Sequence, residues 1–248
     1  MKVATKQVDE TQRRSLQKSH LRVRVAKAAR TLGVYWLGHG RLQIVSSTQE
    51  HWESTYESKS ADQRSWSSNA ATSVQLITRY APTRQESIVD VGAGASPLAG
   101  RLATEGYRDV TVVDVSQRAI DEARESVPAS AAITWVCSDI RAWEPGRSFD
   151  VWHDRAVLHF LSDPEERTAY ARLVRHSLNS GGRLIVSSFA EDGPESCSGL
   201  PVTRATHDQL IQLFGEGFVV VELFREVHRT PWGAEQPFNW LVLKRYPT

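Results

Sequence analysis

Three aspartates and two glycines are spaced along the chain as a nucleoside-binding site would need them. Asp90 lies in an apolar run that leads directly into Gly92 and Gly94. Asp114 ends a second apolar run 20 residues after Gly94, and Asp139 follows a third. Glycines allow the backbone to bend sharply and to approach a ligand closely. A carboxylate in the second position can accept both hydroxyls of a ribose, and one in the third position would meet the amino group of an adenine.

The glycine turn differs in two respects from the fingerprint of dinucleotide-binding proteins. Pro97 stands where that fingerprint has its third glycine, which disfavours a pyrophosphate held close to the backbone. Asp90 adds a negative charge beside the turn, and this charge repels a phosphate but suits an α-amino group. An ammonium, a ribose and an adenine together describe S-adenosylmethionine. The sequence therefore favours this cofactor, and a nicotinamide-dependent dehydrogenase is the less favoured alternative.

A second group of candidate residues follows the apolar run 149–153. Asp154 could accept a proton from a substrate amine or hydroxyl, and Arg155 could either hold an anionic substrate or form an ion pair within the fold. His159 could take part in the chemistry or pack in the core, and His153 could present mainly its backbone to the cofactor. His153 and His159 are six residues apart, a spacing that does not favour a metal site on one helical face. We therefore expect no metal.

Apolar runs alternate with helical patterns along most of the chain. We expect strands at 87–91, 109–114, 132–137, 149–153, 183–189, 218–224 and 238–243, and helices at 49–56, 69–80, 97–105, 117–126, 164–179 and 207–214. Continuous apolar strands separated by helices are typical of a parallel sheet that is covered on both faces. The last two strands have no helix between them, which favours an antiparallel hairpin at the sheet edge. The expected fold is α/β, with a Rossmann-like, mostly parallel seven-stranded sheet, helices on both faces and a C-terminal antiparallel hairpin.

The charge is unevenly distributed along the 248 residues. Residues 1–48 carry ten Lys and Arg against two Asp and Glu, whereas residues 49–248 carry 20 against 27, so that +8 and −7 give the net charge of +1. We therefore expect a basic N-terminal extension over 1–48, disordered or partly helical, and a single α/β domain over 49–248. A nucleic-acid or membrane-surface contact, a targeting segment and a misassigned start remain alternatives for the extension. Two cysteines and no long apolar run suggest a cytoplasmic protein without a membrane span.

The chain resembles the class I S-adenosylmethionine-dependent methyltransferases over about residues 50–245, in the order and spacing of its motifs. The resemblance implies that the methionine end of the donor is held near Asp90, Gly92 and Gly94. It also implies a ribose site at Asp114 with Val115 beside the adenine, and an adenine frame formed by Asp139 and Ile140. The segment 149–161 resembles the strand-four motif of this superfamily, and the resemblance places Asp154 and Arg155 toward the transfer point.

Several short motifs resemble a small bacterial subgroup of these methyltransferases. The subgroup often opens with a His-Trp-x-x-x-Tyr stretch, matched here by His51, Trp52 and Tyr56. It usually continues with Ser-Trp and an aromatic residue, whereas this chain has Ser67 after Trp66. The His-Asp-Arg sequence at 153–155 and the segment 228–233 also match the subgroup.

These observations predict transfer of the methyl group of S-adenosylmethionine to an unidentified acceptor, which we expect to be a small molecule. Protein lysine methylation and a non-catalytic S-adenosylmethionine-binding module are the alternatives. No Asn/Asp-Pro-Pro-aromatic sequence follows the fourth strand, which argues against amino-group methylation of DNA bases. We expect a small-molecule or protein acceptor as partner and no membrane partner, and the sequence gives no firm indication of nucleic acid. The oligomeric state is expected to be a monomer or a homodimer.

Overall fold

A computed structural model describes residues 34–37, 41–44, 47–67 and 69–246. The chain divides into two units, Met1–His51 and Trp52–Thr248. In the first unit, β1 (Val34–Leu37) and β2 (Arg41–Ile44) pair as antiparallel strands. The rest of the predicted extension 1–48 lies almost entirely outside the described residues. Helix α2 (Ser47–Ser58) begins at the end of the first unit and continues into the second.

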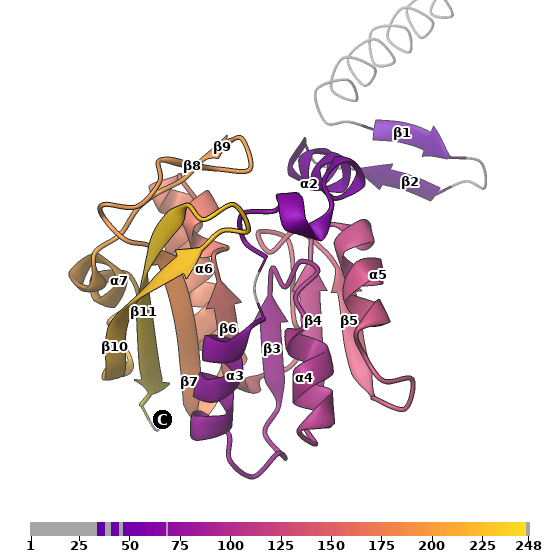
Figure 1. Ribbon diagram of the computed structural model, residues 1–248. Helices are drawn as coiled ribbons and strands as arrows, with labels where there is room; N and C mark the ends of the chain where they lie inside the picture. Colours follow the sequence, from indigo (N-terminus) through magenta and orange to yellow (C-terminus); the bar gives the residue numbers. More distant parts are fainter. Residues whose placement is uncertain (1–33, 38–40, 45–46, 68, 247–248) are drawn as a thin grey trace, which may run out of the picture. The chain divides into compact units, whose positions relative to one another are not determined.

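The second unit is built on a seven-stranded sheet with the order β10-β11-β7-β6-β3-β4-β5 (Figure 1). Its strands are β3 (Ile88–Val91), β4 (Val110–Asp114), β5 (Ile133–Cys137), β6 (Phe149–Arg155), β7 (Leu178–Phe189), β10 (Phe218–Arg229) and β11 (Glu235–Arg245). The strands β7, β6, β3, β4 and β5 are parallel to their neighbours in this order, and β11 runs antiparallel to both β7 and β10. A separate small ribbon pairs β8 (Ser196–Cys197) with β9 (Leu200–Pro201).

Helices cover both faces of this sheet. The helices are α3 (Ala71–Tyr80), α4 (Leu98–Thr104), α5 (Gln117–Glu125), α6 (Pro164–Ser177) and α7 (His207–Phe214), with 3₁₀ turns η1 (Ala61–Gln63) and η2 (Leu158–Phe160). Buried residues of α3 and α4 form one core with the sheet, and buried residues of α6 and α7 form a second core on the opposite face (Figure 1). The predicted mostly parallel seven-stranded fold, with helices on both faces and a C-terminal hairpin, is confirmed.

Local sequence signals account for where several helices begin. Ser116 caps α5 by accepting a hydrogen bond from the backbone N–H of Ala119 at 3.2 Å. Asp163 caps α6, whose first residue is Pro164, as the missing N–H of proline allows. Thr206 and Gln209 form a capping box at α7. These caps determine the residues at which α5, α6 and α7 begin.

The largest differences from the predicted strand boundaries lie at β6, at β7 and in the final hairpin. Strand β6 runs to Arg155 instead of ending at residue 153, so the His-Asp-Arg sequence belongs to the strand itself. Strand β7 begins at Leu178, five residues before the expected start. Leu178 already pairs with Phe149 of β6, and the register then shifts before the pairing of Val151 with Arg183. The final hairpin is also longer than expected: β10 and β11 take up most of the predicted connection 225–237 and leave only residues 230–234 between them.

Candidate active site

The glycine turn after β3 is closely covered by two side chains. Gly92 and Gly94 have φ values of +60° and +57°, a conformation that glycine adopts without a steric penalty. A Cβ atom added to Gly92 would lie 1.9 Å from Cγ2 of Val157, and one added to Gly94 would lie 2.3 Å from the hydroxyl oxygen of Tyr56. The turn therefore requires glycine at both positions, and Tyr56 lies directly against its backbone.

Asp114 lies beside this turn, at the end of β4. Its Oδ2 accepts a hydrogen bond from the backbone N–H of Gly94, and its Oδ1 accepts one from Ser116, both at 2.8 Å. Burial raises the pKa of Asp114 to about 6, and the negative charges of Asp90 and Glu53 act in the same direction. The carboxylate thus connects the glycine turn to the start of α5 in a negatively charged environment.

Asp90 is held in a buried chain of three side chains. His153 Nδ1 donates to Asp90 Oδ1 at 2.7 Å, and Ser73 Oγ lies 3.0 Å from His153 Nε2. An ionised carboxylate only accepts hydrogen bonds, so Nδ1 carries a proton, and in the neutral ring the Ser73 hydroxyl donates to Nε2. Asp90 and His153 are directly paired in the parallel register of β3 and β6, and α3 supplies Ser73. His153 therefore acts here through its side chain, as an orienting group for Asp90.

The loop predicted to frame an adenine has polar contacts of its own. Both oxygens of Asp139 accept hydrogen bonds from Arg141, which lower the pKa of the carboxyl against the opposing effect of burial. Ile140 lines a cavity of about 210 Å³ beside α6. This volume is below the 300–1,000 Å³ that is usual for ligand sites, so the cavity alone is too small for a nucleoside site. The carbonyl oxygen of Val115 lies 3.6 Å from Sγ of Cys137. The adenine roles of Val115, Asp139 and Ile140 stay predictions.

Aromatic side chains cover the glycine turn. Trp52 makes edge contacts with Trp66 and Phe160, with ring centroids 5.7 and 5.2 Å apart. The indole N–H of Trp66 donates to the Tyr56 hydroxyl at 3.2 Å, and the Arg64 guanidinium lies over the Tyr56 ring at 4.5 Å. Burial, with a smaller effect from Asp114, raises the pKa of Tyr56. The Ser-Trp motif thus belongs to this cover although Ser67, not an aromatic residue, follows it.

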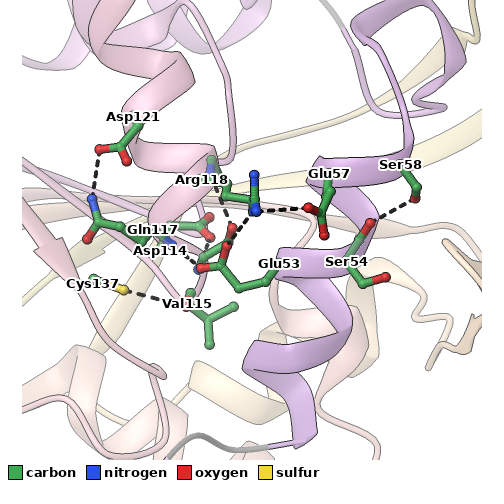
Figure 2. A network of polar contacts seen from close by, with 12 residues as sticks. Glu53, Ser54, Glu57, Ser58, Asp114, Val115, Gln117, Arg118, Asp121 and Cys137 are labelled. Carbon is green, nitrogen blue, oxygen red and sulfur yellow. Dashed lines mark hydrogen bonds and ion pairs between the residues drawn. The ribbon is translucent and has the colours of Figure 1, made fainter. Parts of the chain in front are cut away.

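Glu53 is a site residue that the sequence analysis missed. Its Oε1 accepts a hydrogen bond from the backbone N–H of Gln117 at 2.6 Å, at the first residue of α5. Arg118 lies between the carboxylates of Glu53 and Glu57, at 3.6 and 3.0 Å (Figure 2). The spacing of Glu53 and Glu57, four residues apart on one helix, marks them as neighbours on one helical face. It does not reveal that they meet α5 beside Asp114.

The structure separates Asp154 from the other two predicted catalytic residues, Arg155 and His159. The Asp154 carboxylate is fully buried and accepts hydrogen bonds from the Tyr170 hydroxyl at 2.6 Å and from the Val157 N–H at 2.8 Å. Tyr170 belongs to the α6 face of the sheet, whereas Arg155 lies over Phe238 of the opposite core. Because consecutive residues of a strand point to opposite faces, Asp154 does not join Arg155 at one site. These contacts give Asp154 a structural role and do not support its predicted role as a base.

His159 is fully buried, and its ring packs against the rings of Phe160, Phe189 and Phe238. Burial, together with the charges of Arg155 and Arg167, lowers the pKa of His159 to about 3. The ring is therefore neutral at physiological pH and is a weak base. This environment agrees with the packing alternative, and a part in the chemistry stays a prediction.

The carboxylate groups at the glycine turn suit a cationic ligand. Asp90, Asp114 and Glu53 are carboxylates close enough for the charges of Asp90 and Glu53 to raise the pKa of Asp114. A sulfonium and an ammonium would relieve this repulsion, whereas a pyrophosphate would increase it. Within residues 47–67 and 69–246, no three His, Cys, Asp or Glu side chains are grouped in a way that could hold a metal ion. No helix in the described part of the chain is long and apolar enough to cross a membrane.

Comparisons with known proteins agree with this geometry. The family described as "Methyltransferase domain" matches residues 88–182. Nodulation protein S of Rhizobium tropici is 36% identical over 101 residues, which are 40% of this chain and 42% of that protein. The eEF1A lysine and N-terminal methyltransferase of Homo sapiens is 27% identical over 150 residues, which are 57% of this chain and 21% of that protein. This chain therefore spans less than half the length of either relative.

One solved structure resembles nearly the whole described fold. The 1,6-didemethyltoxoflavin-N1-methyltransferase of Burkholderia thailandensis, with bound 1,6-didemethyltoxoflavin and S-adenosylhomocysteine, matches with a TM-score of 0.62 and 17% identity, over 86% of this chain and 99% of that one. At this identity the likeness concerns the fold alone. Residues 88–182 therefore match the methyltransferase domain family, and the chain shares the fold of the Burkholderia methyltransferase.

Proposed function

We propose that this protein transfers the methyl group of S-adenosylmethionine to a small-molecule acceptor. The observation that carries the proposal is the negatively charged glycine turn, where Asp114 is buried beside the charges of Asp90 and Glu53. A ligand with a positive sulfonium and a positive ammonium compensates these carboxylates. The similar Burkholderia enzyme contains bound S-adenosylhomocysteine and 1,6-didemethyltoxoflavin, which supports the same assignment here.

Each carboxylate has a distinct role in this proposal. Asp114, held by two backbone N–H groups, keeps acceptor capacity for the two ribose hydroxyls. Asp90 takes the α-ammonium, and His153 keeps its carboxylate oriented. Asp139, Ile140 and Val115 frame the adenine, and we assign residues 49–248 to this one catalytic domain. Tyr56 and Trp66 cover the turn and exclude water from the methionine end.

S-adenosylmethionine supplies an already activated methyl group, so the protein contributes mainly by alignment. Alignment of two reactants can lower a barrier by as much as ~7–11 kcal/mol. A general base is needed only when the acceptor arrives protonated. The low pKa of His159 and the buried hydrogen bonds of Asp154 make both weak candidates for that base. We therefore propose an acceptor whose reacting atom is already deprotonated at neutral pH.

Protein lysine methylation is the second candidate function. It is favoured by the 150-residue similarity to the human eEF1A lysine and N-terminal methyltransferase. A third possibility is a module that binds the donor without turnover. Incubating the protein with tritiated S-adenosylmethionine and a cell lysate, followed by size separation, distinguishes these outcomes. Label in the small-molecule fraction supports the first function, a labelled protein band supports the second, and donor binding without any label supports the third.

Calorimetry tests the premise that all three functions share. We expect S-adenosylmethionine to bind with a dissociation constant well below the millimolar range and Asp114→Ala to weaken it strongly. Millimolar binding that Asp114→Ala leaves unchanged would rule out this site. We also propose that the protein is cytoplasmic, as its use of only two cysteines suggests. We propose a monomer or a homodimer, and light scattering measures the oligomeric state.

A further inference from the structure

We propose that Arg155 and the ring cluster around Phe238 form the acceptor subsite, and that this subsite takes a small carboxylic acid with an apolar or aromatic body. The inference rests on the proposed methyl transfer and specifies its substrate class. Sequence alone left Arg155 with two alternatives, an anionic substrate or an ion pair within the fold.

The contacts of Arg155 remove the second alternative. Among residues 47–67 and 69–246, no carboxylate lies within ion-pair distance of the Arg155 guanidinium. Nη1 of Arg155 donates a hydrogen bond to the carbonyl oxygen of Trp66 at 3.2 Å. Partial burial lowers the pKa of Arg155, while Glu226 and Asp90 attract the charge from a distance. A guanidinium has five N–H donors in a planar fork, so most of this fork faces no protein partner.

The two acids near Arg155 are held by other donors. Glu226 Oε1 accepts from the Thr72 hydroxyl at 2.5 Å, and its Oε2 accepts from the indole N–H of Trp240 at 2.7 Å. Asp90 accepts from His153. The fold thus keeps the neighbouring carboxylates away from the guanidinium, which remains able to bind an external anion.

Two further buried polar side chains near Phe238 have no partner. Both ring nitrogens of His159 and the hydroxyl of Ser187 are buried without a hydrogen bond among the described residues. Ser187 is the register partner of Arg155 on the neighbouring strand β7, and the His159 ring lies 6.4 Å from the ring of Phe238. Buried polar groups are rarely left unsatisfied in folded proteins. Both side chains are fully enclosed by protein, however, so the open polar group of this region is the guanidinium of Arg155.

The rings that surround Phe238 define the body of that molecule. Phe189 and His228 lie 4.7 and 6.4 Å from the Phe238 ring, and the Arg155 guanidinium lies over it at 5.4 Å. His228 is fixed by donating from Nε2 to the carbonyl oxygen of Ser65 at 2.7 Å, and burial lowers its pKa. The cluster is thus apolar and uncharged except for one guanidinium. A planar carboxylate matches the fork of an arginine in two parallel hydrogen bonds.

The subsite is also correctly placed for transfer. His153, which holds Asp90 at the donor turn, lies two residues before Arg155 on the same face of β6. At about 3.3 Å per strand residue, Arg155 lies roughly 7 Å further along that face. An acceptor anchored on Arg155 would therefore lie beside the methionine end of the donor.

The test compares acids with their neutral amides on protein saturated with S-adenosylhomocysteine. Benzoate and phenylacetate, each beside its primary amide, are titrated calorimetrically into wild type, Arg155→Met, Arg155→Lys and His159→Phe. Arg147→Met, which changes an exposed arginine paired with Asp109, is the matched control. We expect the acids to bind wild type about ten- to a hundredfold more tightly than the amides, as charge-assisted hydrogen bonds allow.

We expect this preference to disappear in Arg155→Met, to weaken in Arg155→Lys and to be unchanged in Arg147→Met. His159→Phe should leave the preference unchanged, because the His159 ring is enclosed by protein side chains. Equal binding of acids and amides by wild type overturns the proposal, as does a preference that survives in Arg155→Met. Binding of S-adenosylhomocysteine is measured on the same samples, so failure of the donor site itself is recognised separately.

Discussion

Replacing Asp114 with asparagine should remove donor binding without weakening the fold at neutral pH. Both carboxylate oxygens accept backbone hydrogen bonds, and burial raises the pKa of Asp114 from 3.8 to about 6. At 1.36 kcal/mol per pH unit, holding the ionised form in the fold costs ~3 kcal/mol. Asparagine removes that cost but can accept only one of the two hydrogen bonds, and a buried unpaired N–H costs about 1–3 kcal/mol. The unfolding free energy at pH 7.5 should therefore stay equal to that of wild type or rise by up to ~2 kcal/mol.

The pH dependence isolates the contribution of the carboxylate. Because the folded state has the higher pKa, it retains a proton that the unfolded chain has lost between pH 3.8 and about 6. The stability that Asp114 contributes is therefore complete below pH ~4 and is lost as the pH rises through 6. Urea unfolding should show that wild type loses ~3 kcal/mol more than Asp114→Asn between pH 4 and 7. The similar titration of Asp154, whose pKa burial also raises to about 6, is present in both proteins and cancels in the difference.

Calorimetry with S-adenosylmethionine completes this test. Two charge-assisted hydrogen bonds of about 1.5–3 kcal/mol each correspond to a loss of affinity of roughly hundredfold or more in Asp114→Asn. Asp109→Asn is the control, since Asp109 is a half-buried aspartate just before the opposite end of the same strand β4, where it pairs with Arg147. A folded Asp114→Asn variant that binds the donor within threefold of wild type would refute the ribose role. Parallel pH profiles for the two proteins would refute the account of the buried charge.

Three other variants test the surroundings of the turn. Gly94→Ala should lower the unfolding free energy by about 1–3 kcal/mol, because its Cβ would meet the Tyr56 hydroxyl. Adding Tyr56→Phe should recover at least part of this loss, and strictly additive changes of the unfolding free energy in urea would contradict the clash. His153→Ala removes the hydrogen-bond donor to the buried Asp90 carboxylate and should lower the unfolding free energy by about 2–4 kcal/mol. It should also raise KM for S-adenosylmethionine about tenfold with a smaller change in kcat, and an unchanged KM would exclude the positioning role. Glu53→Gln removes one of the charges that raise the pKa of Asp114, so donor binding should persist to lower pH; a midpoint that stays or rises would count against this coupling.

The succession of strands and helices, and the gathering of Asp90 and Asp114 near the glycine turn, follow from patterns that are local in sequence. Short apolar runs separated by helical segments identified the seven strands, and the glycine turn with its nearby acids indicated the sheet edge at which we propose that the donor binds. The strand ends were less accurate. The expected end of β6 at residue 153 was two residues short, because the charged His-Asp-Arg sequence looks like a loop although pairing with β3 and β7 keeps it extended.

Sequence alone therefore determined that Asp90, Asp114 and the two glycines meet at one sheet edge, since parallel strands bring their carboxyl ends together. Tertiary structure decided how each neighbouring side chain is used. Successive strand residues point to opposite faces, so His153 and Arg155 face α3 and the Phe238 cluster while Asp154 faces Tyr170. The partner of His153 is Ser73, 80 residues away, and Glu53 reaches the start of α5 from a separate helix. No local pattern encodes such contacts, because they depend on where packing brings distant segments together.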